Sequence, residues 1–328
     1  MSAGPVSAEG WLGRWIEPVP VPEGSRRPQR LRVPFVLPDG DGDGDSPTIV
    51  SARARVAARG DVALFINDRR LDAEGPSTGP AGEPIAREYD AISTLVAGEN
   101  VVGLILGESW GATTPVPGVR PFPGETPPLA VLFDLVVELS DGSEVVVVSD
   151  ESFRCTTGAI IYSEPGRGER QEHALRDAGW KEAGFDDARW TPPRIAADQS
   201  LDAIVRPDEA ETQEAVRVVG ESAARTQQSW GPGGQVLVDF GRRLVGRLRV
   251  RFTLPAGSEV TLEHLPAHPE EGEPTVIGTD VFVSAGTVDE VFEPGYALHD
   301  FRYVRVTGLP APDAAAFSVL ELSVPAGA

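Results

Sequence analysis

The strongest constraint on the fold of this chain is its hydrophobic periodicity, which over most of its length has the short repeat of β-strands. Residues 53–58 and 61–66 are two strand-like segments, and the turn-forming pair Asn67-Asp68 follows them. Asp141-Gly142 separates two further apolar runs and is a hairpin signal. Many short strands at close spacing predict β-sandwiches or jelly rolls, not a parallel sheet. The fold class that we predict is therefore all-β.

The same pattern continues in the last third of the chain. Six short runs there are expected to be strands, at residues 235–240, 247–254, 260–263, 281–284, 289–293 and 303–307. A length of 328 residues is enough for two domains with separate cores. The polar, irregular stretch 196–212 is the expected boundary, which gives two tandem β-sandwich domains at residues 1–200 and 210–328.

An aromatic segment, residues 179–190, precedes this boundary. Its Trp and Phe side chains are expected to close the bottom of the first sandwich. Asp186 and Asp187 are expected to form a turn through bonds from their carboxylates to nearby main-chain amides.

The charge balance limits the partners. The chain has 29 Lys and Arg against 50 Asp and Glu, a net charge of −21. Such a surface repels nucleic acid and anionic lipid, so we expect neither as a partner. The sequence has no apolar run of about 18 residues and no secretory signal, and we expect a cytoplasmic protein. The single cysteine, Cys155, excludes an internal disulfide and is expected to be a small buried residue.

One sequence pattern resembles a calcium site. Asp39, Asp41 and Asp43 satisfy the first half of a calcium loop, but the twelfth position is Val50 where such a loop needs a glutamate. We expect an acidic loop between two strands, with a calcium site as the alternative. No other cofactor is indicated.

The four histidines are a separate case. His264 and His268 are four residues apart, but Pro266 makes a helix there improbable. Both are expected to be surface or interface residues. His173 and His299 have no evident partners in the sequence, and packing is the expected role of His299.

Several strings in their order along the chain carry a family resemblance. They are residues 64–71, 89–102 and 107–111 in the first half, and residues 238–246 and 298–308 in the second. Together they resemble the β domains that precede the catalytic barrel in bacterial α-L-rhamnosidases, glycoside hydrolase family 78. The resemblance covers residues 11–310 and implies a galactose-binding-like jelly roll followed by a concanavalin-like β-sandwich.

The resemblance also bears on catalysis. In this family a helical barrel of several hundred residues carries the catalytic acids, whereas about twenty residues follow the last matching string here. No hydrolase active site is recognisable, and the sequence leaves open whether the chain is an enzyme.

The candidate ligand site is the rim of the first jelly roll, where an aromatic ring and a few polar groups can hold a sugar. Trp110 is the predicted stacking residue and Glu108 the predicted acceptor of hydroxyl bonds, with Glu74, Ser77 and Glu169 in support. A buried core position is the alternative for Trp110. The equivalent jelly roll of the family binds rhamnose, in some members through calcium.

One departure concerns residues 168–173, which lack the Tyr-Asp pair of the corresponding family motif. Inherited rhamnose binding is therefore not assured by the resemblance alone.

Three functions remain open at this point. The favoured one is non-catalytic recognition of a carbohydrate, a deoxyhexose or its glycoside, or a scaffold role. The second is a repurposed enzyme that uses one acid in a cleft for proton transfer or cyclisation in secondary metabolism. The third is a split or truncated α-L-rhamnosidase that needs a separate barrel chain. A homo-oligomer is a further possible partner arrangement.

Overall fold

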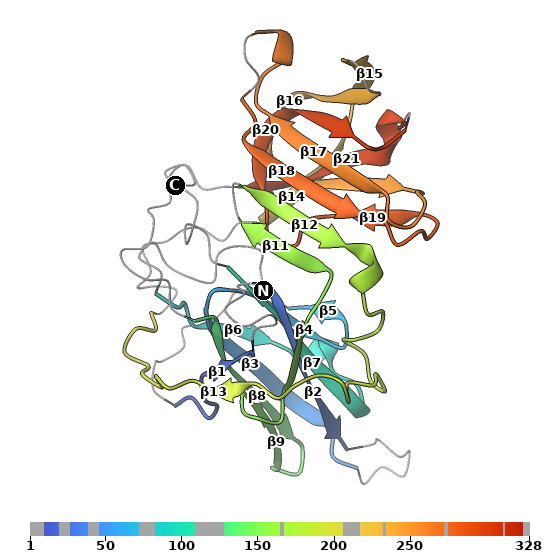
Figure 1. Cartoon of the computed structure of the whole chain (residues 1–328). Coiled ribbons are helices and arrows are strands. Elements are labelled where there is room, and N and C mark those ends of the chain that lie inside the picture. The colour runs from blue at the N-terminus through green and yellow to red at the C-terminus, as the bar shows by residue number, and fades with distance from the viewer. Residues whose placement is uncertain are drawn as a thin grey trace. The chain divides into compact units, whose positions relative to one another are not determined.

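The structure is all-β, as the periodicity predicts, and it is a computed structural model of the chain (Figure 1). No helix in the described part of the chain is long and apolar enough to cross a membrane. The residues that the structure describes are 10–19, 27–38, 46–71, 83–108, 128–164, 167–205, 217–231, 234–271, 275–310 and 312–323.

The chain divides into two compact units. The first contains the described residues up to 108 together with 128–157 and 177–205, and the second contains 158–176 and the described residues from 217 onward. The predicted domain limits remain a prediction. The hairpin at residues 160–172, which those limits assign to the first domain, pairs with a strand of the second unit.

The first unit is built from eleven strands and one 3-10 turn. In chain order they are β1 (Ile16–Glu17), β2 (Gln29–Leu37), β3 (Ile49–Arg59), β4 (Asp61–Ile66), β5 (Arg69–Arg70), β6 (Arg87–Asp90), η1 (Ile92–Thr94), β7 (Gly98–Gly107), β8 (Ala130–Leu139), β9 (Glu144–Val148), β10 (Arg154–Thr157) and β13 (Arg194–Ile195).

These strands form two antiparallel sheets. One has the order β13-β1-β8-β3-β6, with β9 beside β8, and the other has the order β10-β2-β7-β4-β5. Alternate residues of β2 and β7, such as Leu31, Val33 and Leu104, meet Phe133 of β8 in one apolar core. Cys155 is buried in the same core, as expected. The first unit is therefore a β-sandwich.

Two predicted hairpins are present in this unit. Asn67 and Asp68 have φ values of 50° and 63°, the left-handed pair that a two-residue hairpin turn needs, and they join β4 to β5. Asp141-Gly142 lies between β8 and β9, whose ladder closes at Glu138 and Glu144. The turn residues of the sequence thus set the register of both pairs.

The second unit contains ten strands and three 3-10 turns. They are β11 (Ile160–Glu164), β12 (Gly168–Glu172), η2 (His173–Leu175), β14 (Arg217–Ala223), β15 (Thr226–Trp230), β16 (Gln235–Phe252), β17 (Glu259–Leu265), η3 (Pro269–Glu271), β18 (Gly278–Val283), β19 (Glu290–Phe292), β20 (His299–Thr307), η4 (Ala314–Ala316) and β21 (Phe317–Ser323).

All of these strands belong to one sheet with the order β11-β12-β18-β17-β20-β16-β21-β14, while β15 and β19 also pair with β16. The sequence predicts two strands where the structure has the single 18-residue β16. The register of β16 against β20 breaks between Asp239 and Leu244. Its first part pairs with β15 and β20, and its later part pairs with β19 and β21. The sheet thereby curls around an apolar core that includes Phe282, Phe292 and Phe301, and Leu237, Leu265 and Tyr303 form a second, smaller cluster.

The aromatic segment before the boundary packs on the first unit, but against the outer face of one sheet and not at the bottom of the sandwich. The rings of Trp180 and Trp190 are 5.9 Å apart, and Phe185 meets Trp190 edge to face. A Cβ on Gly103 of β7 would lie 3.2 Å from the Trp180 ring, so this ring covers β7 on the face opposite the core. The segment therefore covers the outer face of the sheet that contains β2 and β7.

Arg32 of β2 anchors this segment. Its guanidinium is buried and donates to the carbonyl oxygens of Trp180, Glu182 and Phe185, at 2.9, 3.2 and 3.3 Å. It also forms an ion pair with Asp187. Asp186 accepts the amide of Ala188 and makes the predicted turn, but the carboxylate of Asp187 faces Arg32 instead of a nearby amide.

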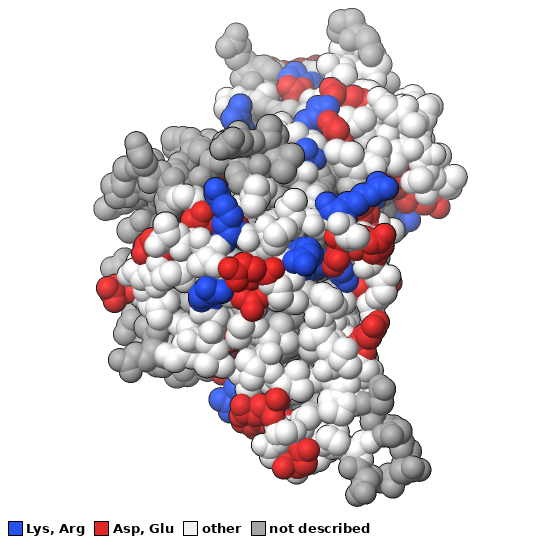
Figure 2. Space-filling model, turned by 60° about the horizontal axis from the view of Figure 1, so that its bottom comes forward, with Lys and Arg blue, Asp and Glu red and all other residues white. Residues whose placement is uncertain are grey.

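Surface charges are locally compensated. On the face shown in Figure 2, Lys and Arg side chains lie among Asp and Glu side chains. Ion pairs such as Arg14 with Glu151 and Arg243 with Asp300 are exposed and contribute little to stability individually. The net charge of −21 is thus carried by acidic groups in excess of these pairs.

Replacement of Arg32 by Met is expected to lower the free energy of unfolding by about 2–5 kcal/mol, because it leaves the three carbonyl groups and Asp187 without their donor. Arg32→Lys is expected to recover only part of this loss, since an ammonium group lacks the planar set of donors. Urea denaturation followed by tryptophan fluorescence measures both. The matched control is Arg14→Met at an exposed pair, with an expected change within about 0.5 kcal/mol; equal effects of the two Met variants would refute the anchoring role.

Candidate functional site

Among the described residues, a dense group of buried, hydrogen-bonded polar side chains lies inside the second unit, where the hairpin β11–β12 joins the sheet. Strand β12 runs parallel to β18, and Glu169 of β12 has no exposed surface. The Glu169 carboxylate accepts bonds from Ser163 Oγ and Gln171 Nε2, each at 2.6 Å. It also accepts the main-chain amides of Gly295 and Tyr296, at 2.9 to 3.1 Å.

Burial raises the pKa of Glu169, and the hydrogen bonds from Ser163, Gln171 and the two amides oppose this effect without cancelling it. A buried carboxylate with a raised pKa is a usual feature of a general acid. Here, however, all the donors come from the chain itself, and the side chain offers no surface to a substrate. The arrangement fixes the loop at residues 293–296 to the hairpin.

A second cluster begins on the main chain of Glu169, whose amide donates to Asp280 Oδ1 at 2.8 Å. The Asp280 carboxylate also contacts two histidines. His264 Nε2 lies 2.9 Å from Oδ2, and His299 Nε2 lies 3.3 Å from Oδ1. The two imidazole rings stack with centroids 3.9 Å apart, and all three side chains are fully buried.

Local sequence places these three groups. His264 shares its strand face with Val260 and Leu262, which belong to the apolar core. Asp280 and His299 are also inward-facing in their strands, two residues before Phe282 and Phe301. Polar residues therefore occupy positions that the alternation assigns to the core.

The pKa values of Asp280 and His264 are both lowered in this buried cluster. Burial raises the pKa of Asp280, but the charge and hydrogen bond of His299 and those of His264 outweigh it and hold the pKa well below its usual range. Burial lowers the pKa of His264 to about 4, and the charge of His299 acts in the same direction. His264 is therefore neutral at neutral pH.

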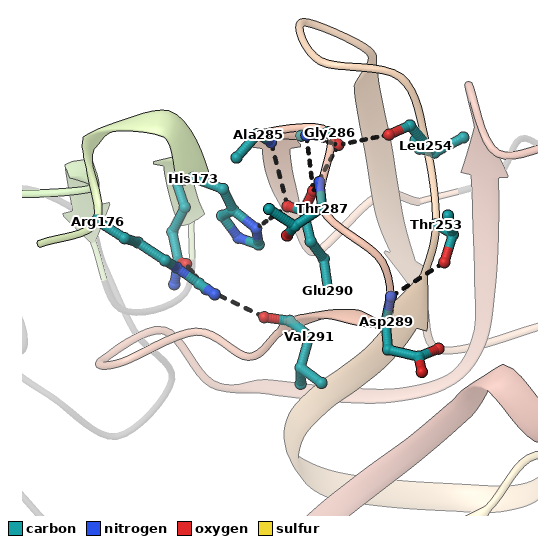
Figure 3. A network of polar contacts seen from close by, with 12 residues as sticks. His173, Arg176, Thr253, Leu254, Ala285, Gly286, Thr287, Asp289, Glu290 and Val291 are labelled. Carbon is teal, nitrogen blue, oxygen red and sulfur yellow. Dashed lines mark hydrogen bonds and ion pairs between the residues drawn. The ribbon is translucent and has the colours of Figure 1, made fainter. Parts of the chain in front are cut away.

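A third network surrounds Glu290 (Figure 3). Its carboxylate lies 2.7 Å from His173 Nδ1, and it accepts Ser284 Oγ at 2.8 Å. The amides of residues 285–287 donate to the same carboxylate at 2.9 to 3.2 Å. The His173 ring stacks on Phe282 and Phe292, so the hydrogen-bonded pair lies against the apolar core.

Both members of this pair have lowered pKa values. Burial lowers the pKa of His173 to about 4, and the charge of Arg176 adds to the effect. Burial alone would raise the pKa of Glu290, but the bonds from Ser284, His173 and the loop amides lower it to about 2. At neutral pH the carboxylate is ionised and the imidazole is neutral.

The structure describes only two of the predicted ligand residues. Glu108 lies next to the end of β7 and is buried, and Glu169 is the interior carboxylate of the second unit rather than a rim residue of the first. The other three, Trp110, Glu74 and Ser77, lie outside the described residues, as do the calcium candidates Asp39, Asp41 and Asp43.

The expectations for the histidines need correction. His264 is not a surface residue, and His173 and His299 do have partners, Glu290 and Asp280. His268 is partly exposed and lies between the rings of Trp230 and Tyr303. The strand alternation around His264 and His299 was the signal that could have identified two buried histidines. The pairing with Asp280 depends on the sheet order, which the sequence does not specify.

Gly278 provides a test of how tightly the His299 ring is held. A Cβ at this position would lie 2.2 Å from Cε1 and 2.3 Å from Nδ1 of His299. Gly278→Ala is therefore expected to displace the ring and to lower the free energy of unfolding by about 1–3 kcal/mol. Thermal unfolding measures the change. Gly220→Ala, in a strand where a Cβ meets nothing within 4 Å, is the matched control, and equal destabilisation in both variants would contradict this geometry.

The His173–Glu290 pair predicts a pH dependence. Unfolded His173 takes up a proton near pH 6.5, whereas the folded residue does so only near pH 4. Between these values the unfolded state binds more protons, so stability falls as the pH falls. Protonation of Glu290 below its unfolded pKa of about 4.5 acts in the same direction at lower pH.

His173→Gln is expected to reduce the loss of stability between pH 6.5 and 4 by about 1–3 kcal/mol, because its side chain does not titrate. Denaturant midpoints across this range measure the effect. His268→Gln leaves the pair intact and should retain the wild-type slope. An unchanged slope in His173→Gln would show that this histidine does not carry the dependence.

Comparison with known families follows the division into two β-rich parts. Residues 48–219 match the α-L-rhamnosidase N-terminal domain, and residues 231–324 match the bacterial α-L-rhamnosidase concanavalin-like domain. An α-L-rhamnosidase of Streptomyces avermitilis is 30% identical over 318 residues, which cover 94% of this chain and 29% of that protein. One from Formosa agariphila is 26% identical and covers 92% of this chain and 33% of that protein.

Solved structures agree with this assignment. Native α-L-rhamnosidase from Aspergillus terreus has a TM-score of 0.82 at 28% identity, over 96% of this chain and 36% of that chain. The Streptomyces avermitilis enzyme complexed with L-rhamnose has a TM-score of 0.79 at 26% identity, over 91% of this chain and 29% of that chain. This chain thus spans about a third of the relatives' length. It belongs to the bacterial α-L-rhamnosidase family, of which it contains the N-terminal and concanavalin-like β domains.

Proposed function

We propose that this chain is a non-catalytic relative of α-L-rhamnosidases. It recognises a carbohydrate or acts as a scaffold. The observation that carries the proposal is the match of the chain to the two β domains of α-L-rhamnosidases. One of these enzymes, from Streptomyces avermitilis, was crystallised with L-rhamnose. A ligand of this class is a neutral deoxyhexose or its glycoside. A neutral ligand also suits a chain with a net charge of −21.

The proposed sugar site stays at the rim of the predicted first jelly roll. Trp110 supplies a face for stacking of sugar C–H groups, and Glu74 and Ser77 supply hydrogen bonds to hydroxyls. Glu108 is buried, and we no longer assign it a sugar contact. Glu169 has a different proposed role. Its carboxylate is saturated by donors of its own chain, so it holds the hairpin and does not contact the sugar.

The repurposed-enzyme hypothesis predicts a buried acid with a raised pKa facing a cleft. Glu169 has the raised pKa, but its oxygens are held by residues 163, 171, 295 and 296 and no part of the side chain is exposed. A general acid has to reach the atom that it protonates. The surroundings of Glu169 therefore do not support the repurposed-enzyme hypothesis.

The coverage of the relatives favours a second candidate function. The chain matches about 29–33% of the length of its curated relatives. The β units would then act as part of a larger α-L-rhamnosidase assembly, in which a separate barrel chain supplies the catalytic acids. This candidate is compatible with sugar recognition, because the same loops can deliver the rhamnoside to such a partner.

Calorimetric titration of the purified chain with L-rhamnose tests the proposal. Binding in the micromolar to millimolar range is expected, which corresponds to about 4–8 kcal/mol. Trp110→Ala is expected to weaken binding at least about tenfold through loss of the stacking face. Trp230→Ala removes a tryptophan of the second unit and should leave the affinity unchanged.

Two further measurements complete this test. Titration after chelation of calcium shows whether the acidic loop takes part, and loss of binding on chelation is expected only if Asp39, Asp41 and Asp43 hold calcium. Absence of any response to rhamnose or rhamnosides would overturn sugar recognition. Rapid hydrolysis of an aryl α-L-rhamnoside by the chain alone, abolished by changing one acid, would overturn the non-catalytic assignment.

A further inference from the structure

We propose that His264, Asp280 and His299 form a binding site for a divalent transition-metal ion of the Zn²⁺ class inside the second unit. The three residues come from β17, β18 and β20, which are neighbours in the sheet with β17 in the middle. One ligand atom from each lies within 4.8 Å of the other two. An ion at this position would tie three adjacent strands together.

The donor set selects the class of metal. Two imidazole nitrogens and one carboxylate oxygen are ligands of Zn²⁺, Co²⁺ and Ni²⁺, whereas Ca²⁺ and Mg²⁺ prefer oxygen alone. Tetrahedral bonds of about 2.0–2.2 Å place neighbouring donors about 3.3 Å apart. The two Nε2–Oδ distances in the cluster, 2.9 and 3.3 Å, are close to that separation. The two nitrogens face different oxygens of the carboxylate, so the stacked rings have to turn before both nitrogens and the carboxylate bind one ion.

The surroundings hold the donors in place. The Glu169 amide donates to Asp280 Oδ1 and helps to orient the carboxylate toward the Nε2 atoms of the two rings. Gly278 leaves the space that the His299 ring occupies, and Phe301 packs against His264 with centroids 4.6 Å apart. The site is thus preorganised by groups that do not themselves bind the ion.

The buried charge of Asp280 and the Nδ1 atoms of the two imidazoles are compatible with the same site. Asp280 is a carboxylate in an apolar interior, and its side-chain contacts are the two histidines and one amide. The Nδ1 atoms of His264 and His299 are buried with no hydrogen-bond partner among the described residues. An ion bound by the two Nε2 atoms would leave each Nδ1 as the protonated nitrogen of a neutral imidazole. A dication also offsets the cost of the buried negative charge.

Because the ligands are inaccessible, the ion has to enter while the unit folds. The wild-type chain is therefore unfolded in denaturant with a chelator and refolded with either Co²⁺ or chelator alone. After gel filtration, elemental analysis is expected to give about one Co²⁺ per chain, with the visible absorption of a low-symmetry cobalt site. The loaded protein should unfold at a higher temperature than the chelator-treated protein, since the ion binds only the folded state.

Variants locate the ion. His264→Gln and His299→Gln each remove one nitrogen donor and are expected to lower Co²⁺ retention at least about tenfold. His268→Gln and His173→Gln change histidines outside the cluster and should retain wild-type loading. Equal loading of all four variants would place the metal elsewhere and overturn the proposal.

A measurement on wild-type protein decides the case if the cluster variants do not fold. Proton NMR of the Co²⁺-loaded chain is expected to show two strongly shifted imidazole N–H signals, one from each histidine ligand. Folded wild-type protein that retains no Co²⁺, or a loaded protein without such signals, would show that the cluster is held by hydrogen bonds alone. Neither result depends on sugar binding, so failure here is distinct from failure of the proposed function.

Discussion

Burial of the Glu169 carboxylate is the interaction on which the second unit depends. Its four donors come from β11, from β12 and from the loop that precedes β20. The amide of the same residue extends the network to Asp280 and through it to His264 and His299. A buried carboxylate is costly unless it is hydrogen-bonded, so each of these donors is also a constraint on where its strand can lie. The bond from the Glu169 amide to Asp280 adds to the parallel pairing of β12 with β18.

Arg32 has the corresponding role in the first unit, with a positive charge. Its side chain points away from the apolar face of β2 and donates hydrogen bonds to three main-chain carbonyls of an irregular segment. In both units a single buried ionic side chain thus orders a piece of chain that has little regular secondary structure. An apolar side chain at either position would satisfy none of these main-chain groups, and the segment would lose its attachment.

Much of the fold was predictable because β-strand patterns are local. The apolar run of β4 and the turn pairs Asn67-Asp68 and Asp141-Gly142 specify strands and hairpins within a few residues of each other. The union of two predicted strands in β16 was not predictable. Residues 241–246 contain two arginines and two glycines, which suggest a turn, but pairing of Leu244, Val245 and Gly246 with β20 and β21 returns the chain to the sheet at once. Tertiary contacts override local preference here.

The polar interior was harder to predict than the strands, for a physical reason. Alternation identifies His264 and His299 as inward-facing, but the partner that makes their burial tolerable is Asp280, on a third strand. That proximity depends on the order and register of β18, β17 and β20, which are set by the whole sheet. Glu169 illustrates the same limit, since its sequence neighbourhood suggests a loop and two of its four donors come from residues more than a hundred positions away. Polar groups of this kind give one register a lower energy than its neighbours, because a shift by one residue would turn every one of them toward solvent and expose the core. The buried network therefore specifies the sheet that the apolar residues stabilise.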